Sequence, residues 1–73
     1  MTAILQERLA EYQQLMESIH NNYQYGRGFV QAVLLAVTMY KEPTSRNEYI
    51  TTMGKTFGIP VEKVERVIAL LPA

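Results

Sequence analysis

The stretch Phe29–Tyr40, FVQAVLLAVTMY, decides which fold this chain is expected to adopt, because Gln31 and Thr38 are its only polar residues. A run of this length without a turn former or a regular alternation of polar and apolar residues indicates a helix rather than a strand. A helix that is apolar on every side is normally buried. We therefore expect it at the centre of the molecule, covered by other helices or by a second subunit, and we expect a charge at Leu34 to unfold the domain.

An amphipathic helix is predicted before this stretch, from about Thr2 to His20, and is expected to stop near Asn21 and Asn22. Its apolar residues recur at intervals of 4, 3, 4, 3 and 4 residues, and Leu15 lies beside this seam, which consists of Leu5, Leu9, Tyr12, Met16, Ile19 and Tyr23. The alternation is typical of a helix that packs on a partner helix. Two interpretations stay open: the helix closes the core of a monomer, or it forms a short coiled-coil-like seam in a homodimer.

The connection between these two helices, Asn21–Gly28 or NNYQYGRG, is rich in turn formers, and Gly26 and Gly28 are expected to permit positive φ angles there. Tyrosine and arginine are enriched among the residues that anchor protein interfaces. The candidate protein-binding residues are accordingly Tyr23, Tyr25, Arg27 and Phe29. In the alternative interpretation, Tyr23 and Phe29 pack into the core and Tyr25 lies on the surface.

Two more helices are predicted after a break at Pro43, since proline cannot continue a helix and disfavours helical geometry at the preceding residue. Ser45 and Glu48 have the spacing of a capping box, which starts a third helix at about Arg46. That helix is expected to run to about Phe57, with Gly58 placed to end it and with Tyr49, Ile50, Met53 and Phe57 on one face.

The fourth helix is expected to have Pro60 in its first turn and to end at Pro72. Its inward residues are predicted to be Val61, Val64, Ile68 and Leu71. The chain is thus predicted to form one all-α domain over residues 1–73, with four helices and short connections.

The last two of these helices carry a second pattern. In residues 50–69, ITTMGKTFGIPVEKVERVIA, apolar residues occupy the five positions that helix-turn-helix motifs usually keep apolar, which here are Met53, Phe57, Ile59, Val64 and Val67. Gly54 falls where a small residue lets two helices approach, and Gly58 falls on the turn. The stretch resembles the helix-turn-helix of bacterial and phage repressors and of sigma-factor domains. The resemblance implies two helices crossing steeply, with the second offered to the DNA major groove.

The charges of the chain weaken this DNA-binding interpretation. The basic residues placed to contact DNA are Arg46, Lys55, Lys63 and Arg66, but Glu62 and Glu65 share the outward face of the second helix of the motif. Base reading favours basic and amide side chains, and phosphate binding usually shows as a basic excess. Seven lysines and arginines are here balanced by seven glutamates, so the net charge is zero.

Composition also argues against catalysis and metal binding. The chain has no cysteine and a single histidine, His20. Glu17 and His20 have the i, i+3 spacing found in di-iron helical bundles, but such a site needs a second pair and further carboxylates. No glycine-rich phosphate loop is present. We therefore expect no enzyme, no cofactor and no metal.

Function is expected to rest on binding. The N-terminus lacks the order of a secretory signal, and the longest apolar run falls short of the roughly 20 residues of a membrane span, so we expect a soluble cytoplasmic protein that binds no membrane. The favoured function is that of a small non-enzymatic helical regulator or adaptor that binds another protein, with homodimerisation as one option. The alternative is a helix-turn-helix transcriptional regulator that binds DNA.

Overall fold

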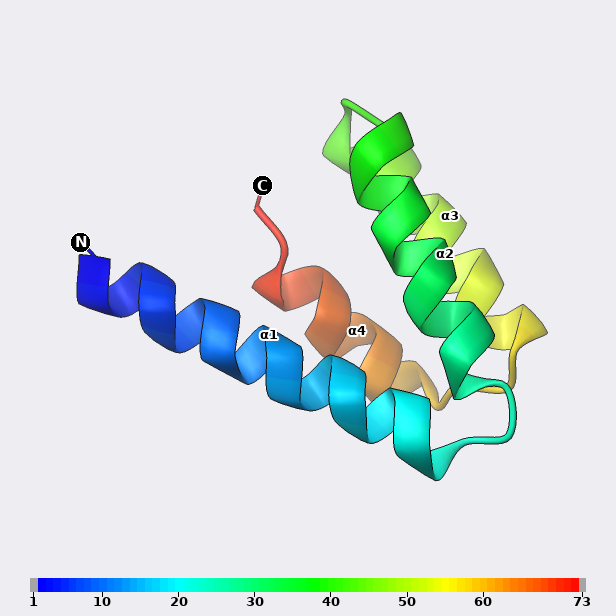
Figure 1. The fold of residues 1–73 in the computed structure, drawn as a ribbon. Coiled ribbons are helices and arrows are strands. Elements are labelled where there is room, and N and C mark those ends of the chain that lie inside the picture. The colour runs from blue at the N-terminus through cyan, green and yellow to red at the C-terminus, as the bar shows by residue number, and fades with distance from the viewer. Residues whose placement is uncertain (1, 73) are drawn as a thin grey trace.

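The computed structural model describes the backbone of residues 2–72 and the side chains of residues 7–72. The chain forms four helices: α1 (Thr2–Asn22), α2 (Gly26–Met39), α3 (Pro43–Thr56) and α4 (Val61–Leu70) (Figure 1). The predicted all-α fold with four helices and short connections is therefore confirmed.

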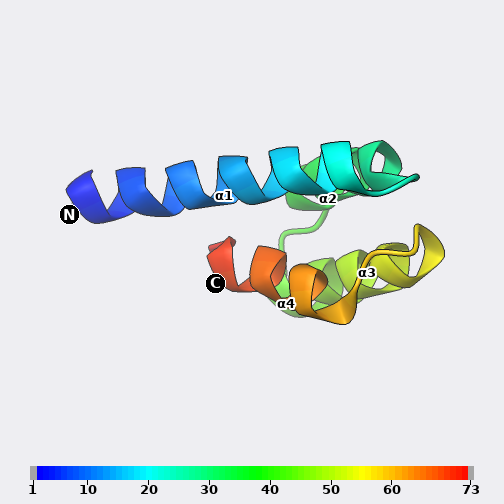
Figure 2. The same cartoon turned by 90° about the horizontal axis from the view of Figure 1, so that it is seen from below.

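The helices pack as a closed ring in two layers. Helices α1 and α2 diverge from the turn that joins them, like the arms of a V, and α3 and α4 form the second layer (Figure 2). Among residues 2–72, α1 packs closely on α2 and α4, and α3 packs closely on α2 and α4. Each helix therefore has two close neighbours in the ring.

The core lies between the two layers and takes residues from all four helices. Its largest fully buried side chains are Ile19 of α1, Phe29 and Val33 of α2, Ile50 of α3 and Val67 of α4. The remaining buried apolar residues, which surround these, are Leu15, Met16, Ala32, Ala36, Ile59, Val64 and Leu71. The seam of α1 therefore packs within one chain over its second half. The side chain of Leu5 lies outside the described residues.

Within one copy of the chain, the other helices cover only one face of α2, so they do not by themselves give the burial that its sequence predicts. Its buried residues recur every three or four positions and so define one face. Leu34, Leu35, Val37 and Met39 lie on its other faces and are 45–64% exposed. The physical reason is the ring arrangement, in which only α1 and α3 pack against α2. A charge at Leu34 is therefore expected to be tolerated by the folded chain.

The turn between α1 and α2 is shorter than predicted, and its glycines act differently. Gly26 and Gly28 are helical residues, and neither has a positive φ. A Cβ atom on Gly26 would overlap the carbonyl oxygen of Ile19 in the last turns of α1, and one on Gly28 would lie 2.8 Å from the ring of Phe57. These two glycines are needed for close contacts between helices.

Helix α3 begins earlier than predicted. Glu42 is extended, with φ −91° and ψ 128°, as expected for a residue before proline, and Pro43 is the first residue of the helix. The capping box at Ser45 is therefore wrong, because Pro43 already starts the helix and Ser45 lies inside its first turn. Helix α3 has no side-chain hydrogen bond at its N-cap.

The corner between α3 and α4 agrees with the sequence at its two glycines. Gly58 follows α3 with φ +72°, and a Cβ atom on Gly54 would overlap Val64 of α4. Pro60 is the N-cap of α4. The expectation that Val61 points inward is wrong, since it is 61% exposed. The helix-turn-helix geometry itself stays a prediction.

Replacing Gly26 should destabilise the chain more than replacing Gly58. In Gly26→Ala the new methyl group meets rigid backbone, so we expect the free energy of unfolding to fall by about 3 kcal/mol. In Gly58→Ala the methyl group meets open space and only the positive φ is penalised, which costs about 1 to 2 kcal/mol. Urea unfolding followed by circular dichroism measures both, and equal losses would contradict the proposed contact.

Candidate functional site

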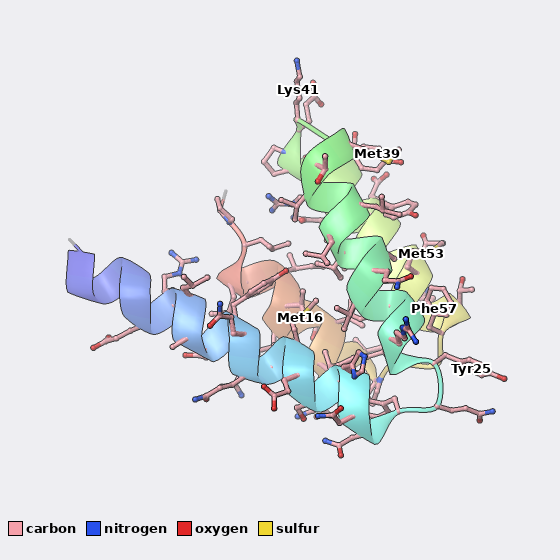
Figure 3. All side chains as sticks on the ribbon, in the orientation of Figure 1. Met16, Tyr25, Met39, Lys41, Met53 and Phe57 are labelled. Atoms are coloured by element: carbon pink, nitrogen blue, oxygen red, sulfur yellow. The ribbon has the colours of Figure 1, made fainter. Side chains whose placement is uncertain are left out.

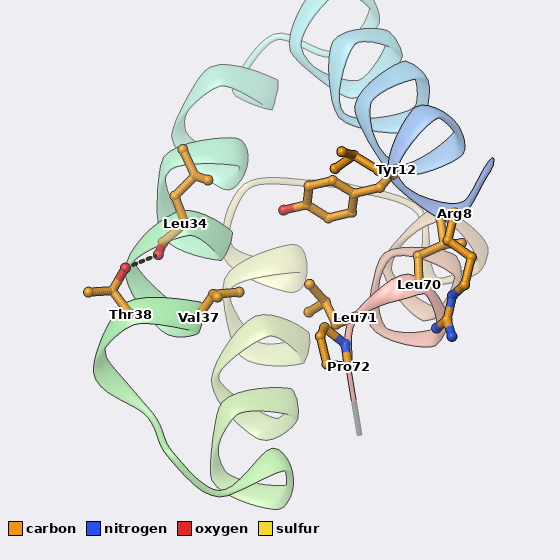
Figure 4. Close-up of a pocket in the computed structure, with 9 residues that line it drawn as sticks. Arg8, Tyr12, Leu34, Val37, Thr38, Leu70, Leu71 and Pro72 are labelled. Atoms are coloured by element: carbon orange, nitrogen blue, oxygen red, sulfur yellow. Dashed lines mark hydrogen bonds between the residues drawn. The ribbon is translucent and has the colours of Figure 1, made fainter. Parts of the chain in front are cut away.

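An apolar groove lies between the diverging arms of α1 and α2 and is the site that the fold offers most clearly. Its volume is about 500 Å³. The residues that line it are Arg8, Leu9 and Tyr12 of α1, Leu34, Val37 and Thr38 of α2, and Leu70, Leu71 and Pro72 at the end of the chain (Figure 4). We call it the α1–α2 groove.

The floor of the α1–α2 groove is held in place by two arginines. Arg46, which is buried in the first turn of α3, donates from Nη1 to the carbonyl oxygen of Pro72 at 2.7 Å and from Nε to Asn47 Oδ1 at 3.0 Å. Arg8 of α1 donates to the carbonyl oxygen of Ala69 at 3.2 Å. These hydrogen bonds anchor the last turn of α4 and the segment after it between the arms of the V.

The polar groups of the groove are mostly engaged with the backbone. Thr38 donates its hydroxyl to the carbonyl oxygen of Leu34 at 2.9 Å, and the guanidinium of Arg8 is bonded to Ala69 as described. Tyr12 is half-buried among the apolar residues, and this burial raises the pKa of its phenol above the ordinary value of 10.0. The groove thus presents mainly hydrocarbon and one aromatic ring.

The structure separates the four candidate protein-binding residues. Phe29 is fully buried, and Tyr23 is partly buried against the core. Tyr25 is 56% exposed and projects from the α1–α2 turn (Figure 3), while Arg27 is exposed in the first turn of α2. Tyr25 and Arg27 therefore remain accessible at the closed end of the V, and neither lines the α1–α2 groove.

The four candidate DNA-binding residues are also not equivalent. Arg46 is buried and bonded to Pro72, so its guanidinium is not available to a phosphate. Arg66 is exposed and lies 3.3 Å from Glu11 Oε2, an ion pair between α4 and α1. Lys55 is exposed on α3 and Lys63 is partly exposed on α4. Two of the four are therefore already engaged within the chain.

The other features singled out in the sequence have local contacts. His20 lies in the last turn of α1, and its Nδ1 is 3.1 Å from Asn21 Oδ1. No group of three His, Asp or Glu side chains able to hold a metal ion occurs among residues 7–72. Over the described part of the chain, every helix is too short or too polar to cross a bilayer.

Sequence reasoning did not identify the groove. It assigned Leu34 and Val37 to a fully buried helix and Leu71 to the inward face of α4, although Leu34 and Val37 are in fact about half exposed. One signal was available: Phe29–Tyr40 contains more apolar residues than a single buried face requires. The role of Arg46 had no local signal, because its partner Pro72 is 26 residues away.

Alkaline pH should destabilise the chain through Tyr12. Because burial raises the pKa of this phenol, the folded chain keeps a proton that the unfolded chain releases above about pH 10, so the free energy of unfolding falls as the pH rises. Tyr12→Phe should reduce this fall, measured by urea unfolding at about pH 9 and about pH 11. Tyr25→Phe removes an exposed hydroxyl and is the matched control; an equal effect of both changes would contradict the assignment.

Comparison with protein-family models, with curated proteins and with solved structures finds no match for this chain. The geometry of the α1–α2 groove is therefore the basis on which function can be argued.

Proposed function

We propose that this chain is a small non-enzymatic helical regulator or adaptor that acts by binding a helix of another protein chain in the α1–α2 groove. The observation that carries the proposal is the apolar lining of the groove, in which Leu9, Leu34 and Val37 are 45–56% exposed. Contiguous exposed apolar surface on a small protein is typical of an interaction site.

The shape of the groove favours a helix as the bound element. Its two walls are themselves helices that diverge from a common turn, and its floor is the anchored segment Leu70–Pro72. An amphipathic helix binds in such a groove by placing its apolar face between the walls. A helix also satisfies its own backbone hydrogen bonds, so it needs few polar partners from the groove.

The charges of the lining support an apolar partner surface. Arg8 is the single charged residue among the lining residues, and its guanidinium is bonded to the carbonyl oxygen of Ala69. A ligand with a strongly charged face therefore has little to pair with here. The partner is best described as a helix with leucine-like side chains along one face.

The DNA-binding alternative receives less support. Of its four candidate residues, Arg46 holds the end of the chain and Arg66 is paired with Glu11. Lys55 and Lys63 remain, and Glu62 and Glu65 lie on the same helix as Lys63. Phosphate binding depends on several cations acting together. Two lysines beside two carboxylates are therefore expected to bind phosphate only weakly.

Photo-crosslinking in the native host tests the proposed function with a matched control. Leu34 and Leu35 are neighbours of the same type with 55% and 53% exposure, but only Leu34 lines the groove. Benzoylphenylalanine in place of Leu34 should give a protein adduct that the same group in place of Leu35 does not. The adduct should disappear when Val37→Asp is added, because a charge then occupies the apolar wall.

Two results would overturn the proposal. One is the absence of a protein adduct at position 34. The other is equal adduct formation at positions 34 and 35, since this indicates random collision rather than binding in the groove. Circular dichroism of the Val37→Asp variant should show unchanged helix content, because Val37 is 45% exposed and contributes little to the core.

A further inference from the structure

We propose that the helix bound in the α1–α2 groove is the N-terminal half of α1, residues 2–12, from a second copy of this chain. Two copies then form a two-fold dimer in which each supplies a helix to the groove of the other. This inference rests on the proposed function, because it names the partner of the same groove.

The apolar seam of α1 continues toward the N-terminus past the part of the helix that is buried in the core. At 1.5 Å per residue the 21 residues of α1 span about 32 Å, whereas the 10 residues of α4 span about 15 Å. The first turns of α1 consequently extend beyond α4 (Figures 1 and 2). In the second half of α1, Leu15, Met16 and Ile19 are buried, whereas Leu9, beside the end of α4, is 56% exposed.

The spacing of this seam is that of a helix-packing face along its whole length. Leu9 and Tyr12 continue the 3,4 alternation into the first half of α1, where Arg8 and Glu11 bond to α4 but Leu9 stays 56% exposed and Tyr12 only half-buried. The apolar side of this half that stays exposed at Leu9 is the surface on which a helix from a second copy would pack. The exposed Leu34 and Val37 of a second copy provide an apolar helix surface of the required kind.

The geometry is self-complementary. The N-terminal half of α1 is one wall of the groove in its own copy. A two-fold rotation that places α1 of the first copy in the groove of the second copy therefore also places α1 of the second copy in the groove of the first. This is the defining property of an isologous interface, in which the same patch serves on both subunits.

The exposed area of the chain has the size that such a dimer requires. A compact monomer of 8.4 kDa exposes about 4,600 Å², whereas this chain exposes 5236 Å². The excess of about 600 Å² per copy is close to the area that each partner buries at the lower end of specific interfaces. We therefore expect a reversible dimer at the lower end of this size class.

Electrostatics do not oppose the pairing of identical chains. The net charge is zero, so two copies approach without mutual repulsion. Two charged side chains of the α1 segment already have partners within their own chain. Glu11 pairs with Arg66, and Arg8 donates a hydrogen bond to the carbonyl oxygen of Ala69. The apolar surface thus remains the dominant feature that one copy presents to another.

Sedimentation equilibrium of the purified chain tests the dimer. The wild type should show a mass of twice 8.4 kDa at micromolar concentration and dissociate on dilution. Leu34→Asp should weaken dimerisation by about 100-fold or more, because each dimer receives two buried charges, while Leu35→Asp should dimerise like the wild type. Both residues are half-exposed in one copy, and only Leu34 lines the groove.

A wild type that remains at 8.4 kDa overturns the dimer but leaves the proposed function standing if position 34 crosslinks to a different protein in the host. A dimer that withstands Leu34→Asp overturns the groove as its interface. The two proposals therefore fail by different observations.

Disulfide trapping tests which element occupies the groove, and the absence of native cysteine makes the result unambiguous. A Leu9→Cys chain mixed with a Val37→Cys chain should form a disulfide between the two chains under mild oxidation. The same Leu9→Cys chain mixed with a Leu35→Cys chain should not. If the dimer forms but 37–37 disulfides prevail and the 9–37 disulfide is absent, α2 rather than α1 is the occupant and the inference is wrong.

Discussion

The arrangement of this chain depends on one close contact, the approach of Gly26 to the carbonyl oxygen of Ile19. A side chain of any size at position 26 would overlap a backbone atom, which cannot rotate away as a side chain does. The contact lets α2 start directly beside the last turns of α1, so that the two helices form a V with a short turn. The V in turn provides the two walls of the α1–α2 groove, and it leaves α3 and α4 to close the core from one side only.

A second interaction, the hydrogen bond from the buried guanidinium of Arg46 to Pro72, links α3 to the segment after α4. Arg46 is one of the first residues of α3, and it donates a hydrogen bond to the carbonyl oxygen of Pro72, 26 residues further along the chain. A buried guanidinium is costly unless it is hydrogen-bonded, and here the Pro72 carbonyl and the Asn47 side chain accept from it. The bonds place Leu71 and Pro72 between α1 and α2. The same residue that sequence reasoning assigned to DNA therefore shapes the floor of the groove instead.

What could be predicted from the sequence was mostly local. Gly58 acts on its own backbone, so the end of α3 follows from residue type, whereas the start of α3 was placed at Arg46 and lies at Pro43. The 3,4 spacing in α1 identified the face that carries Met16 and Ile19. The exposed face of α2 was not predictable in this way, because an apolar run does not say which neighbours cover it. The groove was also beyond local reasoning, since its lining comes from three segments that only the tertiary fold brings together.

The two faces of α2 explain why so small a chain carries so much uncovered apolar surface. A domain of this size buries a smaller share of the area that its unfolded chain exposes than a larger domain does, and it is correspondingly marginal. Leucine and valine at positions 34 and 37 add nothing to the core of one copy, because they are 55% and 45% exposed. They add stability only when something binds the folded chain and not the unfolded one. Folding and binding are then linked, since any helix that fills the groove also contacts Leu71 and Pro72, the segment that Arg46 anchors to the rest of the fold.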